Sequence, residues 1–195
     1  MRSHLLSIAL CAGLFGAAAQ AAPVALSINS GISVQAYSGS AAVNAGNLDI
    51  SDNLFYIREQ EVNGVQSWYL FYDPRGRQTV QATLDFGAPI LDVITTSAGL
   101  ASSVGTYGVD VDGDGSFDDY ANRALMGLEN NDSVGWTLGG STLTIDWSAI
   151  DPGDHVRVLL QMPTQAVPEP GSLALAGLAL GGLLLTGRRA QAKAR

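Results

Sequence analysis

Hydrophobic and polar residues alternate over much of the chain between residues 22 and 166, and turn sequences interrupt the alternation about every ten residues. A period of two predicts β-strands, because successive side chains of a strand point to opposite faces. Roughly seven or eight strands are predicted, within residues 24–37, 54–61, 66–72, 78–86, 89–95, 134–138, 141–147 and 155–162. A helical turn or two fits the pattern only at residues 119–128. We therefore predict an all-β fold, an antiparallel β-sandwich of jelly-roll-like type.

Two hairpins can be placed from their turn residues. Asn63-Gly64 suits a type I′ turn, in which both positions need a positive φ. Pairing Val62 with Val65 around it predicts Ile57 opposite Leu70. This register predicts two faces. One holds Phe55, Ile57, Leu70 and Tyr72, with Trp68 and Glu59 nearer the tip. The other holds Leu54, Tyr56, Tyr69 and Phe71 around Arg58. The second hairpin turns at Gly139-Gly140 and predicts Trp136 opposite Leu143.

The first twenty-one residues have the layout of a secretory signal peptide. Arg2 precedes an apolar run over residues 5–19, and Ala19-Gln20-Ala21 has the small-x-small form that signal peptidase cleaves. The run is short against the length of a membrane span, about 20 residues, and retention as an anchor is the alternative. Cys11 lies inside the run and lacks the placement of a lipoprotein cysteine. Cleavage after Ala21 leaves no thiol, which excludes disulfides, thiolate metal sites and cysteine nucleophiles.

The other end of the chain combines a proline-rich motif, an apolar stretch and a basic tail. Pro168-Glu169-Pro170 keeps the backbone extended, because proline fixes φ and disfavours helix in the residue before it. The stretch of about residues 171–187 is rich in Leu, Ala and Gly and reaches the lower limit for a transmembrane helix, about 17 residues. The basic tail 188–195 contains Arg188 and Arg189. Positive charge near a span stays in the cytoplasm, so the domain is expected across the membrane from this tail.

This arrangement resembles the PEP-CTERM sorting signal over roughly the last thirty residues. The resemblance implies a Gram-negative bacterium that makes exopolysaccharide, with an inner-membrane exosortase that cuts near Pro168 to Pro170. The recognition residues it implies are Pro168, Glu169, Pro170, Arg188 and Arg189. The domain is then anchored transiently in the inner membrane and later released or transferred to the cell surface or the exterior. An ordinary single-pass anchor with a proline-rich stalk is the alternative.

The two ends divide the chain into three parts. These are a signal peptide at residues 1–21, a β-sandwich domain at 22–166 and a sorting signal at 167–195. The middle part has roughly 145 residues, enough for one domain with a core of its own.

Acidic residues dominate the part of the chain between its ends. From Asp49 to Glu169 there are five arginines against eighteen acidic residues and no lysine, which gives a net charge of −13. A field of this sign repels nucleic acid and anionic lipid and attracts divalent cations. Nucleic-acid binding is therefore excluded. Most of the individual acidic residues are explained by the need to keep a secreted domain soluble.

Residues 110–119 carry the chemical motif of the chain. Carboxylates alternate at positions 1, 3 and 5, and a glycine at position 6 permits a sharp bend. The motif resembles the calcium loops of EF-hands, dockerins and thrombospondin type 3 repeats. The ligands implied by that resemblance are Asp110, Asp112, Asp114, the Ser116 carbonyl and Asp118. Ala121 replaces the bidentate acid of those loops, so Asp119 or a water must complete the shell, and the expected Kd is about 10⁻⁴ to 10⁻³ M. A solvated acidic turn is the alternative.

The sequence gives little support to catalysis. His155 is the one histidine of the predicted domain, and we expect it at the surface of its strand. Nucleophile motifs, phosphate loops and zinc spacings are absent from the sequence, so we expect no enzyme. Glycoside hydrolysis needs only two carboxylates, which leaves a secreted hydrolase as a remote alternative.

Two non-catalytic functions fit the sequence better. The first is a structural or adhesive role in an extracellular polysaccharide or biofilm matrix, with exosortase and signal peptidase as processing partners. The second is a calcium-assisted carbohydrate-binding module. Its candidate stacking residues are Trp68, Tyr69, Tyr72, Trp136 and Trp147. Each of these rings can instead belong to the buried core, where aromatic side chains contribute large apolar areas.

Overall fold

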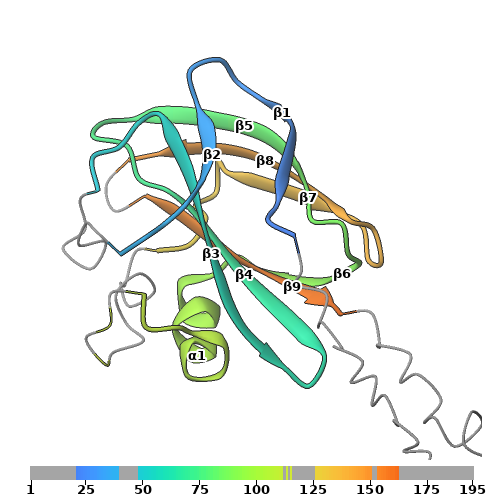
Figure 1. The fold of residues 1–195 in the computed structure, drawn as a ribbon. Helices are drawn as coiled ribbons and strands as arrows, with labels where there is room; N and C mark the ends of the chain where they lie inside the picture. Colours follow the sequence, from blue (N-terminus) through green and yellow to red (C-terminus); the bar gives the residue numbers. More distant parts are fainter. Residues whose placement is uncertain are drawn as a thin grey trace, which may run out of the picture. The chain divides into compact units, whose positions relative to one another are not determined.

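The computed structural model describes residues 21–39, 48–111, 113, 115, 126–150 and 153–162. Within these ranges the chain forms nine strands and one helix (Figure 1). In chain order they are β1 (Val24–Ile28), β2 (Ser33–Ala36), β3 (Asn53–Val62), β4 (Val65–Tyr72), β5 (Gln78–Asp85), β6 (Ile90–Ile94), α1 (Ser97–Tyr107), β7 (Ser133–Trp136), β8 (Thr142–Ala149) and β9 (Asp154–Gln161). Across the described ranges, no helix combines the length and the hydropathy that a membrane span requires.

The strands form two sheets (Figure 1). The four-stranded sheet has the order β1-β5-β8-β7, and the five-stranded sheet has the order β2-β3-β4-β9-β6. Paired strands are antiparallel except β2, which runs parallel to β3. The predicted all-β sandwich is confirmed at this level, and the predicted antiparallel pairing is corrected at β2. β2 ends at Ala36 and β3 begins at Asn53, and sixteen intervening residues are enough for a parallel pair, which a two-residue hairpin turn cannot form.

The main core lies between the two sheets. Alternate residues of β5 and β8 face it from one sheet, and alternate residues of β4 and β9 face it from the other. Among its fully buried members are Leu70, Tyr72, Val80, Leu84, Leu143, Trp147, Val156, Val158 and Leu160. Burying a large apolar side chain stabilises a fold by about 1.5–3 kcal/mol. This layer therefore holds the two sheets together.

A second core covers the outer face of the five-stranded sheet, on the side where α1 lies (Figure 1). It is built from Phe55 and Ile57 of β3, Tyr69 and Phe71 of β4, Leu100 and Val104 of α1, and Met126. The Phe55 and Phe71 rings stack with their centroids 5.3 Å apart. The centre of the five-stranded sheet is consequently buried on both faces, which explains why seven of the eight β4 residues are buried and one is half-buried.

Helix α1 was not predicted from the sequence, which allowed helical turns only at residues 119–128. Its eleven residues are mostly Ser, Gly and Ala, which carry little amphipathic signal. Thr96 caps its start by accepting a hydrogen bond from the Gly99 amide, and Leu100 and Val104, one turn apart, are its buried residues. Packing against the sheet, rather than intrinsic propensity, therefore accounts for the helix. Residues 119–125 lie outside the described ranges.

The β3–β4 hairpin has the predicted turn but a different register. Asn63 and Gly64 have φ values of 53° and 77°, and Val62 pairs with Val65, as predicted. A bulge between Arg58 and Glu61 then shifts β3 by one residue, so that Ile57 pairs with Tyr69 instead of Leu70. A one-residue shift exchanges the faces of a strand. Leu54 and Tyr56 consequently join the inter-sheet core, whereas Phe55 and Ile57 join the core beneath α1.

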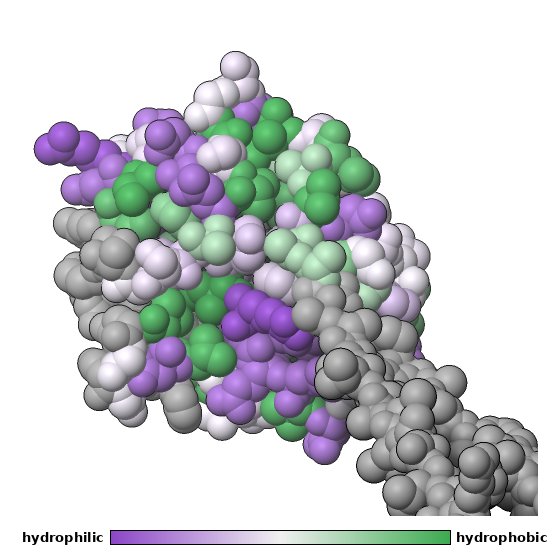
Figure 2. Space-filling model, in the orientation of Figure 1, coloured by the Kyte–Doolittle hydropathy of each residue, from purple (hydrophilic) through white to green (hydrophobic). Residues whose placement is uncertain are grey.

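The edge strand β1 exposes two apolar side chains. A bulge between Ala25 and Ser27 places Ala25 and Ile28 against the core. Val24 and Leu26 are 59% and 60% exposed. Figure 2 shows hydrophobic residues gathered over this strand.

Candidate functional site

The aromatic residues predicted as ligand-stacking candidates are mostly core residues. Trp68 is 2% exposed, and Tyr69, Tyr72 and Trp147 are fully buried. No ring face is available to a ligand at these four positions, so their assignment is corrected to the core. Trp136 is half-buried at the edge of the four-stranded sheet, opposite Leu143 as predicted.

His155, expected at the surface, is fully buried. Its ring stacks on Phe71 with an interplanar angle of 9° and a centroid distance of 5.4 Å. The prediction was wrong because α1 and its neighbouring loops cover this outer face of the sheet, which a two-layer sandwich leaves open to solvent.

The described part of the predicted calcium loop is its beginning. The Asp110 carboxylate accepts hydrogen bonds from the Gly113 amide at 2.7 Å and from the Gly115 amide at 2.8 Å. Both glycines have a positive φ, 83° and 90°. Asp110 therefore holds the start of this segment in a turn, while the calcium loop stays a prediction. Asp112, Asp114, Ser116, Asp118 and Asp119 lie outside the described residues.

The residues predicted for export and sorting lie almost entirely outside the described ranges. Ala21 is described and exposed. Ala19, Pro168, Glu169, Pro170, Arg188 and Arg189 are not described, nor is the predicted span at about residues 171–187.

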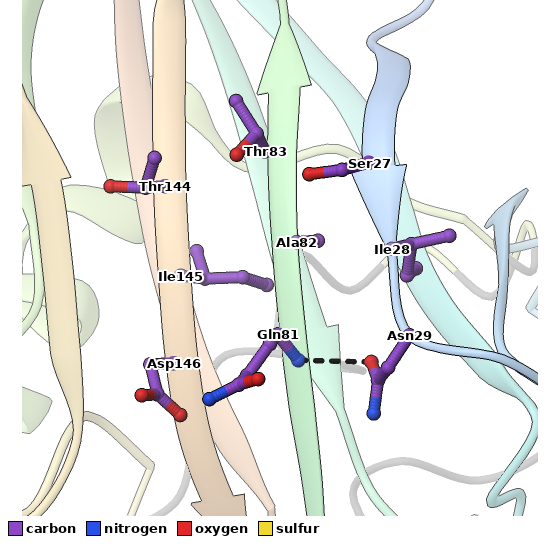
Figure 3. A pocket seen from close by; sticks show the side chains of 9 residues that line it. All are labelled: Ser27, Ile28, Asn29, Gln81, Ala82, Thr83, Thr144, Ile145 and Asp146. Atoms are coloured by element: carbon purple, nitrogen blue, oxygen red, sulfur yellow. Dashed lines mark hydrogen bonds between the residues drawn. The ribbon is translucent and has the colours of Figure 1, made fainter.

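A polar groove of about 360 Å³ lies on the outer face of the four-stranded sheet (Figure 3). Two rows of polar side chains cross the strands, one from Ser27 over Thr83 to Thr144 and one from Asn29 over Gln81 to Asp146 (Figure 3). The Asn29 side chain fixes the end of the lower row. It accepts a hydrogen bond from the backbone amide of Gln81 at 3.0 Å and donates one to the backbone carbonyl of Thr79 at 3.0 Å. Hydroxyls, amides and one carboxylate form the polar lining, and these groups hydrogen-bond to other polar molecules.

An acidic cluster at one end of the sandwich was not predicted from the sequence. It consists of Glu129, Asp132 and Asp154, and one carboxylate oxygen of each lies within 4.8 Å of the others. Glu129 is exposed, Asp132 is half-buried and Asp154 is 1% exposed. Asp154 lies 22 positions after Asp132 along the chain, so no local spacing could have revealed the cluster.

Two turns bring these carboxylates together. The Asp132 amide donates to the Glu129 carbonyl at 3.1 Å, and the Asp132 carboxylate accepts from the Glu129 amide at 3.2 Å and from the Ser148 amide at 2.6 Å. This turn is thereby fixed to β8, in the four-stranded sheet.

Asp154 begins β9, in the five-stranded sheet, where it pairs with Tyr72. Gly153 precedes it with a φ of 84°, and a Cβ there would lie 2.5 Å from the Tyr72 carbonyl oxygen. Glycine at 153 therefore allows the close approach that places Asp154 in the cluster.

The cluster is electrostatically unfavourable when its acids are ionised. Burial, and then the charges of Asp132 and Glu129, raise the pKa of Asp154 to about 8. Burial and the neighbouring Asp132 also raise the pKa of Glu129. Arg77 opposes both shifts, while its guanidinium donates to the carbonyl and hydroxyl of Ser148 at 3.3 Å.

Comparison with known proteins identifies the tail. Residues 166–190 match the PEP-CTERM protein-sorting motif. Neither a curated protein nor a solved structure matches the chain. The motif indicates an exported protein that is held at the membrane for processing by an exosortase and then reaches the surface or the exterior.

Proposed function

We propose that this chain is an exosortase substrate whose β-sandwich has a non-catalytic structural or adhesive role in an exopolysaccharide or biofilm matrix. The match of residues 166–190 to the sorting motif carries the proposal. Signal peptidase acts at Ala19-Gln20-Ala21, and the exosortase then recognises Pro168, Glu169 and Pro170. The anchor at about residues 171–187 and the basic tail at 188–195 are left behind.

The sandwich supports a role that depends on durability and surface contacts. Its two cores are continuous layers of buried apolar and aromatic side chains. The single cysteine of the chain, Cys11, lies in the predicted signal peptide, so the exported part is stabilised without disulfides. An acidic, lysine-free surface keeps such a domain soluble outside the cell and discourages contact with nucleic acid.

Localisation in the native host tests the sorting step. The triple variant Pro168→Ala/Glu169→Ala/Pro170→Ala is expected to stay in the inner-membrane fraction, while the wild-type domain appears at the surface or in the medium. A matched control, Pro163→Ala, changes a proline just before the motif and is expected to leave export unchanged. Equal release of the triple variant and the wild type would contradict exosortase processing.

The second candidate is a carbohydrate-binding module, and the polar groove favours it. Sugar hydroxyls pair with the same hydroxyl, amide and carboxylate groups that line this groove (Figure 3). Binding of the full chain, in mild detergent, to the host's exopolysaccharide is expected to fall in Gln81→Ala and Asp146→Ala. Thr79→Ala, on the same strand outside the groove, is the control. Unchanged binding in both groove variants would place the contact elsewhere.

Calcium binding at residues 110–119 is part of this second candidate. Asp110, Asp112, Asp114, Ser116 and Asp118 are the proposed ligands, with Asp119 or a water completing the shell. The double hydrogen bonding of Asp110 to the Gly113 and Gly115 amides supports a loop that curls around its first carboxylate. Calorimetric titration of the full chain is expected to lose one calcium-binding event in Asp112→Asn/Asp114→Asn, and retention of every event would contradict this site.

A further inference from the structure

We propose a second cation site, formed by Glu129, Asp132 and Asp154, in which a calcium ion joins the two sheets at one end of the sandwich. This site is separate from the predicted loop at residues 110–119 and does not depend on the sorting function. Its basis is the convergence of one carboxylate oxygen from each residue within 4.8 Å of the others.

A second, independent observation at the buried Asp154 also favours a cation. Asp154 is 1% exposed, and its Oδ2 atom has no hydrogen-bond partner among the described residues. Buried carboxylate oxygens normally have a hydrogen-bond partner, because leaving one unsatisfied costs the full penalty of taking that atom out of water. A cation between the three carboxylates would provide the partner and remove the repulsion between them.

Arg77 is the positive group that acts on this cluster, and it does not take the place of a bound cation. Its Nη1 atom donates to the carbonyl and the hydroxyl of Ser148, each at 3.3 Å. The guanidinium therefore reduces the repulsion from beside the cluster while the Asp154 Oδ2 atom stays unpaired.

The ligand set fits calcium. All three side chains offer carboxylate oxygen, which favours hard cations over zinc or copper. Calcium accepts irregular shells with oxygens at about 2.3–2.6 Å, whereas magnesium demands a near-ideal octahedron at about 2.0–2.1 Å and usually keeps several of its waters. Glu129 lies at the exposed side of the cluster, so waters can complete a coordination shell of 6–8 oxygens there.

The position of the site suggests what the ion does. Asp154 belongs to β9 in the five-stranded sheet, while the Glu129–Asp132 turn is hydrogen-bonded to Ser148 in the four-stranded sheet. A shared ion therefore links the two layers across the edge of the main core. Extracellular modules bind calcium with Kd values of about 10⁻⁴ to 10⁻³ M, so the link would form after export, where calcium is plentiful.

Thermal unfolding of the full chain in mild detergent tests the site, with EDTA or about 2 mM calcium chloride present. A site of this affinity is expected to raise the wild-type Tm by about 3 °C. Glu129→Gln and Asp154→Asn are expected to remove most of that rise. Glu129 is exposed, so Glu129→Gln keeps the test valid if Asp154→Asn fails to fold. Asp92→Asn removes one exposed acid of β6 and is expected to keep the full rise.

A double variant separates this site from the predicted loop. Glu129→Gln/Asp110→Asn is expected to have a smaller calcium-induced rise than Asp110→Asn alone, because the two sites share no ligand residue. A wild-type chain without any rise, or a full rise in both Glu129→Gln and Asp154→Asn, would overturn the proposal. An equal rise with magnesium at the same concentration would overturn the assignment to calcium.

Discussion

Arg157 and Glu59 form a fully buried, two-pronged ion pair on the helix-facing side of the five-stranded sheet. The Nε and Nη2 atoms of Arg157 donate to the two Glu59 carboxylate oxygens, each at 2.6 Å. The Nη1 atom donates to the Leu100 carbonyl at 3.0 Å and to the Ser103 hydroxyl of α1. The ion pair thus connects the helix to the sheet. The Arg157 guanidinium carbon also lies 5.2 Å from the centroid of the Tyr69 ring.

Removing one partner of this pair is expected to destabilise the chain strongly. Arg157→Met or Glu59→Leu alone should lower the free energy of unfolding by about 3–5 kcal/mol, because a buried charge is left without its partner. The double variant Glu59→Leu/Arg157→Met should lose less unfolding free energy than either single variant. Urea denaturation measures all three, and a double loss equal to the sum of the single losses would contradict a coupled pair.

Gly153 is expected to tolerate alanine poorly. It combines a φ of 84° with a Cβ position 2.5 Å from the Tyr72 carbonyl oxygen and 2.9 Å from the Asp73 Cα. Gly139 has a similar φ of 79°, but no atom lies within 4 Å of its Cβ position. Gly153→Ala should therefore cost about 2–4 kcal/mol of unfolding free energy and Gly139→Ala about 1 kcal/mol. Equal losses of unfolding free energy in the two variants would show that the close approach at Gly153 does not contribute to the cost of the substitution.

The calcium-free chain is expected to lose stability as the pH rises from about 4 to about 8. Burial, together with the charges of Asp132 and Glu129, raises the pKa of Asp154 to about 8, whereas an unfolded aspartate titrates near about 3.9. The folded chain therefore holds the proton more tightly. The stability from protonated Asp154 is complete below the unfolded pKa and is lost as the pH rises through the folded pKa.

Urea midpoints in EDTA at about pH 5 and about pH 8 measure this effect. Asp154→Asn cannot ionise at this position, so its midpoint should fall less than that of the wild type over the same interval. If the urea midpoints of the wild type and the variant fall by the same amount, Asp154 is not the cause of the pH dependence.

Local patterns predicted most of the strands, because alternation and turn residues are properties of neighbouring positions, whereas the stretch 24–37 forms two strands, β1 and β2, in different sheets. Asn63-Gly64 adopts the type I′ turn, and Val156, Val158 and Leu160 share the core face. The β3 bulge between Arg58 and Glu61 could not be predicted, since one extra residue in a strand leaves the alternation on either side intact. It nevertheless exchanged the faces assigned to four residues of β3.

The features that escaped prediction depend on contacts between distant segments. Helix α1 has a weak pattern of its own and forms on the sheet face that Phe55 and Phe71 provide. Burial of His155 follows from the layer that covers this face. The acidic cluster forms only in the folded chain, where the turn before β9 places Asp154 beside Asp132.

The termini of the mature protein show whether signal peptidase and an exosortase process this chain. Intact-mass and terminal-peptide mass spectrometry of native material from the host, with and without its exosortase gene, would identify both processed ends. When the exosortase is present, the chain is expected to begin at Ala22 and to lack residues 188–195. When the gene is deleted, the chain is expected to keep its tail in the membrane. Recovery of a chain with both original ends, in the cytosol of either strain, would contradict this processing.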